Sequence, residues 1–277
     1  MTEGPDAFWA TLRREIRLTD CIALAVVPAM LAAVFVLPVE TRMAYAFVYE
    51  RPTVLTAYTA HFVHRSLDHF LANALGYTML AGIGYVLAVL GDARRLFGVA
   101  SATYLLAFPP ILSALNLAIP RNAVGYGFSG VTMAFAGLLA VMLSSYAGRR
   151  LHPAANIRYA PAGFLGALVV AAVSVSDGSR VAVVLAGAAA LGVLGYAVSA
   201  VTAHRGEPAH ATLRRPGWLE LFVVGFAVFA GYPFVGFPTE LRAGSGVVNE
   251  YVHLLGFCLA FLVAYLVAEA DVLDADT

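Results

Sequence analysis

A serine and a histidine stand in the two most informative apolar stretches of this chain. Ser129 belongs to a Gly-Phe-Ser-Gly pattern that begins one hydrophobic stretch, and His253, followed three residues later by Gly256, begins another. Polar side chains are costly to keep in membrane-embedded sequence, so their presence there indicates a function. A serine hydroxyl becomes a nucleophile when a neighbouring neutral imidazole takes its proton. The pair therefore predicts a hydrolytic site inside the bilayer.

The composition is that of a polytopic membrane protein. Of the 277 residues, 61% are hydrophobic and only 12% are charged, and the mean hydropathy is +0.80. Soluble domains are typically about 25% charged. The 17 basic and 17 acidic residues cancel, and the seven histidines are scattered without a His-Glu-x-x-His motif. The sequence therefore predicts a lipid bilayer as the surroundings, with no nucleic-acid partner, metal ion or other cofactor.

Hydropathy predicts an all-α, polytopic membrane helix bundle with about eight transmembrane helices. Each predicted span is near the roughly 20 residues that a helix needs to cross the hydrocarbon core. Pro109-Pro110 falls inside the third span and should kink or break it. The spans are 21–37, 67–90, 97–119, 128–146, 159–175, 181–203, 219–235 and 248–268.

The arginines predict the orientation of the bundle and divide the chain into three segments. With a cytoplasmic N-terminus, eleven arginines lie on the inner side and six on the outer side, which places both termini in the cytoplasm of a multi-pass cell-membrane protein. Segment 1–20 alternates apolar residues and arginines at helical spacing, as in an amphipathic helix on the cytoplasmic surface. Segment 21–268 is the transmembrane domain, and 269–277 is a short acidic cytoplasmic tail. The aromatic-rich loop 38–66 should lie at the outer headgroup region.

Three of the predicted helices run in the same direction and carry polar residues in their first turns. These residues are His69 and Asn73 in the second helix, Ser129 in the fourth and His253 in the eighth. Because a helix rises about 1.5 Å per residue, they should lie at similar depth. They can converge if the three helices are neighbours.

In these three helices the sequence resembles the rhomboid family of intramembrane serine proteases. The motifs that carry the resemblance are His64-x4-His69-x3-Asn73, Gly127-x-Ser129-Gly130 and His253-x2-Gly256-x3-Ala260. The resemblance implies a six-helix core. The family core has one helix between the serine and histidine helices, whereas this chain has three, so 159–203 is predicted to be a two-helix insertion. The helix 219–235 would then be the lateral gate for substrate, and the loop 236–250, with Gly244-Ser245-Gly246, the flexible cap.

The resemblance also implies a role for each matching residue. Ser129 would be the nucleophile and His253 the general base, while His69, Asn73 and the backbone N–H of Ser129 would form the oxyanion hole. The implied substrates are transmembrane segments of other proteins, and the oligomeric state is not set by the sequence. The supporting positions are Gly127, Gly130, Gly256 and His64.

Two positions depart from the family pattern. The family commonly has an aromatic residue four positions after the serine, where this chain has Met133, so the orientation of the histidine needs another support. The long first loop lacks the Trp-Arg pair that is often found there, which predicts a different loop fold.

Each polar residue also has a simpler interpretation. Ser129 could cap a helix end, and His253 could pair within its helix with Glu250. His69 could lie among lipid headgroups. For His61 and His64 we favour that interpretation over a catalytic role. The predicted site would be absent only if all of these simpler interpretations were correct at once.

Two other classes of function remain open. One is a catalytically silent rhomboid-like protein that binds transmembrane clients. The other is a transporter with a relay of buried histidines, which inverted repeats would support, and the sequence has no convincing internal repeat.

Overall fold

The computed structural model describes residues 5–119, 122–153, 155–174, 180–203, 216–238, 242–243 and 246–270, and nearly all of its regular structure is helical. Within these ranges, seven helices are long and apolar enough to cross a membrane, and the bent pair α6 and α7 would make an eighth span. The predicted all-α polytopic bundle is therefore confirmed. The long helices are α2 (Leu18–Phe35), α5 (Leu67–Leu90), α6 (Arg94–Leu106), α7 (Phe108–Asn116), α8 (Ser129–Tyr146), α9 (Ala160–Ser174), α10 (Arg180–Ala203), α11 (Trp218–Gly236) and α12 (Glu250–Glu269).

Shorter elements connect these helices. Helix α1 (Pro5–Glu15) precedes the first span, and two antiparallel pairs of two-residue strands join loops, β1 with β2 and β3 with β4. The short elements are α3 (Val39–Met43), β1 (Phe47–Val48), α4 (Val54–Thr59), η1 (Ala60–Phe62), β2 (Val124–Gly125), η2 (Ala147–Leu151), η3 (Ile157–Tyr159), β3 (Arg242–Ala243) and β4 (Gly246–Val247).

The third predicted span is broken where its prolines predict a break. Helices α6 and α7 meet at an angle of 50°. Pro109 and Pro110 occupy the first turn of α7, where the absent proline N–H would have no helical partner in any case. The kink is therefore confirmed and has a local cause.

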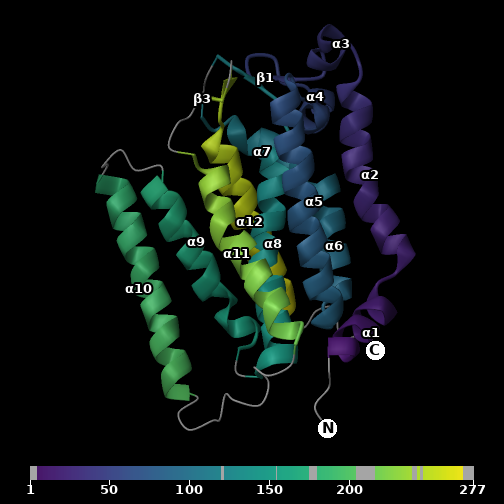
Figure 1. Cartoon of the computed structure of the whole chain (residues 1–277). Helices are drawn as coiled ribbons and strands as arrows, with labels where there is room; N and C mark the ends of the chain where they lie inside the picture. Colours follow the sequence, from purple (N-terminus) through teal and green to yellow (C-terminus); the bar gives the residue numbers. More distant parts are fainter. Residues whose placement is uncertain are drawn as a thin grey trace.

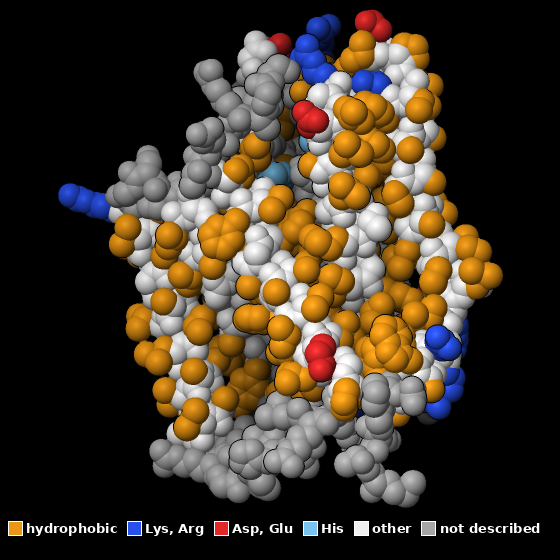
Figure 2. Space-filling view, in the orientation of Figure 1, with side chains coloured by type: hydrophobic (Ala, Val, Ile, Leu, Met, Phe, Trp, Pro, Cys, Tyr) orange, Lys and Arg blue, Asp and Glu red, His pale blue; other side chains and the backbone are white. Residues whose placement is uncertain are grey.

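Helix α8 is the centre of the bundle, and α10 lies at its edge (Figure 1). In the most apolar window of each span, 89% of the α8 residues are buried against 6% of the α10 residues. Helix α8 is central because it packs against α5, α6, α9, α11 and α12. Figure 2 shows apolar side chains over the flank of the bundle and charged groups toward its two ends, as expected of a protein surrounded by lipid.

Glycines bring the backbones of α8 and α12 into contact. A Cβ on Gly256 would collide with the carbonyl oxygen of Gly130, and one on Gly137 would collide with the carbonyl oxygen of Phe257. Small residues permit this close approach of membrane helices. The contact fixes the relative position of the helices that carry Ser129 and His253.

The loop between α2 and α5 packs on the protein at the end of the bundle where α8 begins. Strand β1 pairs with β2, with Phe47 opposite Gly125. The Arg42 guanidinium donates to the carbonyls of Phe35, Leu37 and Arg65, which ties the end of α2 to the start of α5. The loop predicted to lie among headgroups therefore also supports the segment that leads into Ser129.

Helix α1 packs on the opposite end of the bundle. The Phe8 side chain is buried and meets the Trp218 ring edge-on, with 5.2 Å between the ring centroids, whereas Trp9 is exposed. The predicted amphipathic segment is thus helical, and part of its apolar face covers the start of α11. The predicted tail beyond Ala270 and the Gly244-Ser245 part of the predicted cap lie outside the described residues.

The α8–α12 contact predicts which glycines are intolerant of a side chain. Gly137→Ala should lower the free energy of unfolding by about 1–3 kcal/mol, because the rigid backbone of α12 cannot give way. Gly82→Ala in α5 is the matched control, since a Cβ there meets nothing within 4 Å. Thermal unfolding in detergent measures both variants, and equal stability of the two would contradict the packing argument.

Candidate functional site

The turn before α8 positions Ser129. Gly127 has a φ of +113°, which favours glycine, and a Cβ there would lie 2.5 Å from Cε1 of His69. Its N–H donates to the carbonyl of Ala60 at 2.9 Å. The N–H of Phe128 donates to Nε2 of His64 at 3.3 Å. Contacts with η1 and with residues at the start of α5 therefore hold this turn in place.

Ser129 is the first residue of α8 and is partly exposed. The N–H groups of the first helical turn lack helical acceptors and carry the positive end of the helix dipole. No side-chain hydrogen bond caps this helix. The cap position belongs to Phe128, so the interpretation of Ser129 as a capping serine is wrong, and its hydroxyl has no hydrogen-bond partner among the described residues.

His69 and Asn73 lie on α5 beside this turn. The His69 imidazole packs against Gly127 and meets the His64 ring edge-on at 4.9 Å between centroids. Asn73 is buried, and its Nδ2 donates to the carbonyl of His69 at 2.8 Å, which leaves one amide N–H. His69 is therefore in contact with the segment that carries Ser129, while Asn73 lies one turn further along the helix.

His253 is buried in the first turns of α12, only 6% exposed. Its Nδ1 lies 2.6 Å from the carbonyl oxygen of Gly236, and its ring meets Phe237 edge-on at 6.3 Å. The predicted alternative, a pairing with Glu250, is wrong, because Nδ1 bonds to Gly236 and Oε1 of Glu250 has no hydrogen-bond partner. The imidazole is thus oriented by α11.

The serine and histidine turns adjoin each other. A Cβ on Gly130 would lie 3.0 Å from Cγ2 of Val252, the residue before His253. No hydrogen bond joins Ser129 to His253, both of which are described. In enzymes without substrate, such bonds are often long and tighten only when substrate binds.

His61 and His64 are buried, so their interpretation as headgroup-solvated residues is wrong. Burial lowers the pKa of His61 to about 4. Burial, with a smaller contribution from His69, lowers the pKa of His64 to about 3. His64 is therefore neutral near pH 7, as a hydrogen-bond acceptor for Phe128 N–H must be.

A second serine and histidine pair has a structural role. Nε2 of His61 lies 3.0 Å from Oγ of Ser113, whose hydroxyl donates to the carbonyl of Ala57 at 2.8 Å. Because this serine proton is already donated, His61 must donate to the hydroxyl and cannot activate it. The pair ties η1 to α7.

Sequence reasoning missed two groups near the candidate site. Asn249 caps α12 by accepting the N–H of Val252 at 3.3 Å, and its Nδ2 donates to Oδ1 of Asn116 at 3.0 Å. An asparagine just before an apolar helix is a known start signal, which could have revealed this cap. The Gly236 carbonyl is a main-chain atom at the end of another helix, so no sequence pattern indicates it.

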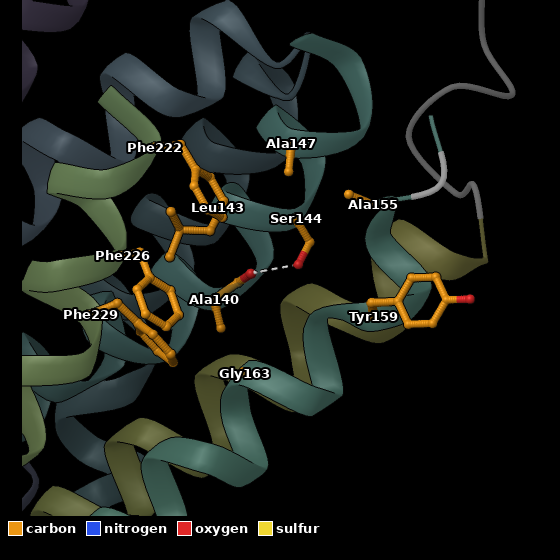
Figure 3. Close-up of a pocket in the computed structure, with 10 residues that line it drawn as sticks. All are labelled: Ala140, Leu143, Ser144, Ala147, Ala155, Tyr159, Gly163, Phe222, Phe226 and Phe229. Carbon is orange, nitrogen blue, oxygen red and sulfur yellow. Dashed lines mark hydrogen bonds between the residues drawn. The ribbon is translucent and has the colours of Figure 1, made fainter. Parts of the chain in front are cut away.

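A pocket of about 180 Å³ lies toward the other end of α8 (Figure 3). Its lining is mainly apolar, and the Ser144 hydroxyl donates to the Ala140 carbonyl at 3.2 Å. The pocket offers no paired acid and base, so it is not the candidate site. The lining residues are Ala140, Leu143, Ser144, Ala147, Ala155, Tyr159, Gly163, Phe222, Phe226 and Phe229.

The candidate site contains imidazole, hydroxyl and amide groups. Within the described ranges, no group of three or more His, Cys, Asp or Glu side chains could hold a metal ion. In comparisons with known proteins, the chain matches no family model, no curated protein and no solved structure.

The buried imidazole of His64 predicts a pH-dependent stability. Unfolded His64 binds a proton below about pH 6.5, whereas folded His64 resists protonation until about pH 3. The free energy of unfolding should therefore fall as the pH drops through this window, by at most about 1.4 kcal/mol per pH unit for one group. His64→Gln keeps an acceptor for Phe128 N–H and should flatten the slope.

Melting in detergent between pH 7 and pH 4 measures this slope. His61→Gln is the parallel variant. It should reduce the pH dependence of the free energy of unfolding by a similar amount, because the folded pKa of His61 is about 4. Slopes unchanged from the wild type in both variants would show that neither buried imidazole governs acid stability.

Proposed function

We propose that this chain is an intramembrane serine endopeptidase of the rhomboid type. It would hydrolyse peptide bonds in or near the transmembrane segments of other membrane proteins, with Ser129 and His253 as its dyad. The observation that supports this most directly is the contact between the first turn of α8 and the His253 turn of α12, through Gly130, Val252 and Gly256. This contact brings the turn with the partly exposed Ser129 hydroxyl next to the turn with the buried His253 imidazole, which Gly236 orients.

The tautomer of His253 suits a general base. A carbonyl oxygen can only accept, so Nδ1 carries the proton in its bond to Gly236. The neutral ring then keeps the lone pair on Nε2. That lone pair would take the hydroxyl proton of Ser129 as Oγ attacks the scissile carbonyl carbon.

Ser129 and His253 also carry the remaining steps of the reaction. The carbonyl oxygen becomes an oxyanion, and the donors available to it are the N–H of Ser129, His69 and the remaining amide N–H of Asn73. The C–N bond then breaks, and the proton on His253 passes to the leaving amine. Water, deprotonated by His253, hydrolyses the acyl-enzyme and restores the Ser129 hydroxyl.

Helix arrangement supports a rhomboid-like core with an insertion. Helices α5, α8 and α12 carry the matching motifs and pack together, with α8 between the other two. Helices α9 and α10 form the proposed insertion, and Phe164 of α9 stacks on Phe257 and Phe261 of α12 at 5.1 and 4.0 Å. We infer from the arginines that both termini are cytoplasmic and that the site faces the outer side of the cell membrane.

A substrate helix would reach the site between α5 and α11. At this contact the Tyr232 hydroxyl packs tightly on Gly76, which has no side chain to oppose it. Only 28% of the most apolar window of α11 is buried, so this helix has fewer interior contacts to lose than α8. Displacement of α11 would therefore cost fewer buried contacts than displacement of α8.

Two observations favour a second candidate function, a catalytically silent binder of transmembrane clients. Ser129 and His253 share no hydrogen bond in the structure, and Met133 replaces the aromatic residue expected of the family. A fluorophosphonate probe separates the two functions, because it labels only an activated serine. Labelling of Ser129 that is lost in His253→Ala supports the protease, and no labelling of the wild type supports the binder.

Cleavage of a transmembrane substrate in lipid vesicles tests the proposal. Ser129→Ala and His253→Ala should lose turnover, because they remove the nucleophile and its base. Asn73→Ala should lose about 100-fold, the typical effect of removing one oxyanion donor. Ser144→Ala is the matched control, since this serine lies at the other end of α8 and bonds to its own helix. Unchanged cleavage by Ser129→Ala would refute the assignment.

A further inference from the structure

The His253 base has a specific partner on another helix, and this partner is a main-chain atom. Nδ1 of His253 on α12 lies 2.6 Å from the carbonyl oxygen of Gly236, the last residue of α11. In soluble serine proteases an aspartate occupies the corresponding place, where it fixes the tautomer and stabilises the imidazolium that forms. A corresponding role for the Gly236 carbonyl rests on the proposed protease function.

The Gly236 carbonyl is free for this role because it ends a helix. The last four carbonyls of an α-helix have no helical donor, and they carry the negative end of the helix dipole. The N–H of Phe237 turns back to the carbonyl of Pro233 at 2.8 Å, so the Gly236 carbonyl remains for the imidazole. Its partial negative charge favours the positive ring that forms when His253 accepts a proton.

Glycine at this position sets the distance between α11 and the site. A Cβ on Gly236 would lie 2.5 Å from Sδ and 2.9 Å from Cε of Met133, on the second turn of α8. Met133 is 1% exposed, so its thioether has little room to move. A side chain at residue 236 would therefore have to displace the buried Met133 thioether if the end of α11 is to stay beside His253.

The partner belongs to a lightly packed helix. Near the loop end of α11, Phe234 and Val235 are exposed at 61% and 65%, while Tyr232 and Pro233 are buried. Any movement of α11 that admits a substrate helix beside α5 also moves Gly236. Withdrawal of the Gly236 carbonyl by about 1 Å would lengthen the 2.6 Å separation beyond hydrogen-bond range.

We propose that the Gly236 carbonyl is the positioning group of the His253 base, so that the base is competent only while α11 is docked against α8 and α12. Opening of the bundle would release the imidazole, and return of α11 would restore the tautomer with its lone pair on Nε2. Substrate entry and activation of Ser129 are thereby coupled through one main-chain hydrogen bond. Met133, which stands where the family commonly has an aromatic residue, packs against Gly236.

A steric variant and its second-site partner test this coupling. Gly236→Ala should slow the labelling of Ser129 by a fluorophosphonate probe about ten-fold or more, because general-base assistance requires an aligned imidazole. The probe is small and needs no lateral entry of a helix. Gly236→Ala combined with Met133→Ala removes the clash and should label at the rate of Met133→Ala alone. Gly231→Ala is the matched control on the same helix, since a Cβ there meets nothing within 4 Å, and it should label as the wild type.

Nitrogen-15 NMR of histidine-labelled protein reports the tautomer directly. The resonances lost in His253→Ala identify this ring, and in the wild type they should show a protonated Nδ1 and an unprotonated Nε2. Gly236→Ala should shift them toward a mixture of tautomers, which a change in folding stability alone would not do. The combined variant with Met133→Ala should restore the wild-type pattern.

The outcomes separate this inference from the proposed function. Wild-type labelling and an unchanged tautomer in Gly236→Ala would overturn the positioning role and leave the dyad intact. Failure of the combined variant to recover, although its thermal unfolding matches Met133→Ala, would also overturn it. Labelling that persists in Ser129→Ala, or is absent from the wild type, would instead overturn the protease proposal.

Discussion

Glycine allows α8 and α12 to pack with their backbones in contact, and the candidate site depends on this contact. Gly137 faces the carbonyl of Phe257, and Gly256 faces the carbonyl of Gly130. In a membrane, helices gain little from the hydrophobic effect against one another, so close packing of small residues is a main source of their association. The same packing that holds the bundle together therefore sets the distance between the serine turn and the histidine turn.

Around this contact, hydrogen bonds hold the main chain of the serine turn and of the first turn of α12 in place. The His64 ring accepts the N–H of Phe128, the Gly127 N–H bonds to Ala60, and Asn249 caps the helix of His253. Each bond satisfies a main-chain group that would otherwise be costly to bury in an apolar environment. The loop after α2 is thus part of the site, since η1 supplies one of these acceptors. Rigid surroundings of this kind are what a preorganised oxyanion site requires.

In the proposed mechanism, helix α11 has two roles that oppose each other. It must be able to move if a substrate helix enters beside it, yet its final carbonyl orients the imidazole that the chemistry needs. Light packing serves the first role, and the absence of a side chain at Gly236 serves the second. Helices α9 and α10 lie outside this arrangement, with α9 stacked on α12 and α10 at the edge of the bundle.

The sequence by itself determined the class of fold, the positions of the spans and the break at Pro109-Pro110, because hydropathy and proline act locally along the chain. It also singled out Ser129, His69 and His253 as polar residues at one depth. Only the tertiary structure decided that His61 and His64 are buried, that Glu250 does not hold His253, and that the Gly236 carbonyl does. These facts depend on which helix faces lie together, and a main-chain acceptor at a helix end leaves no signature in residue types.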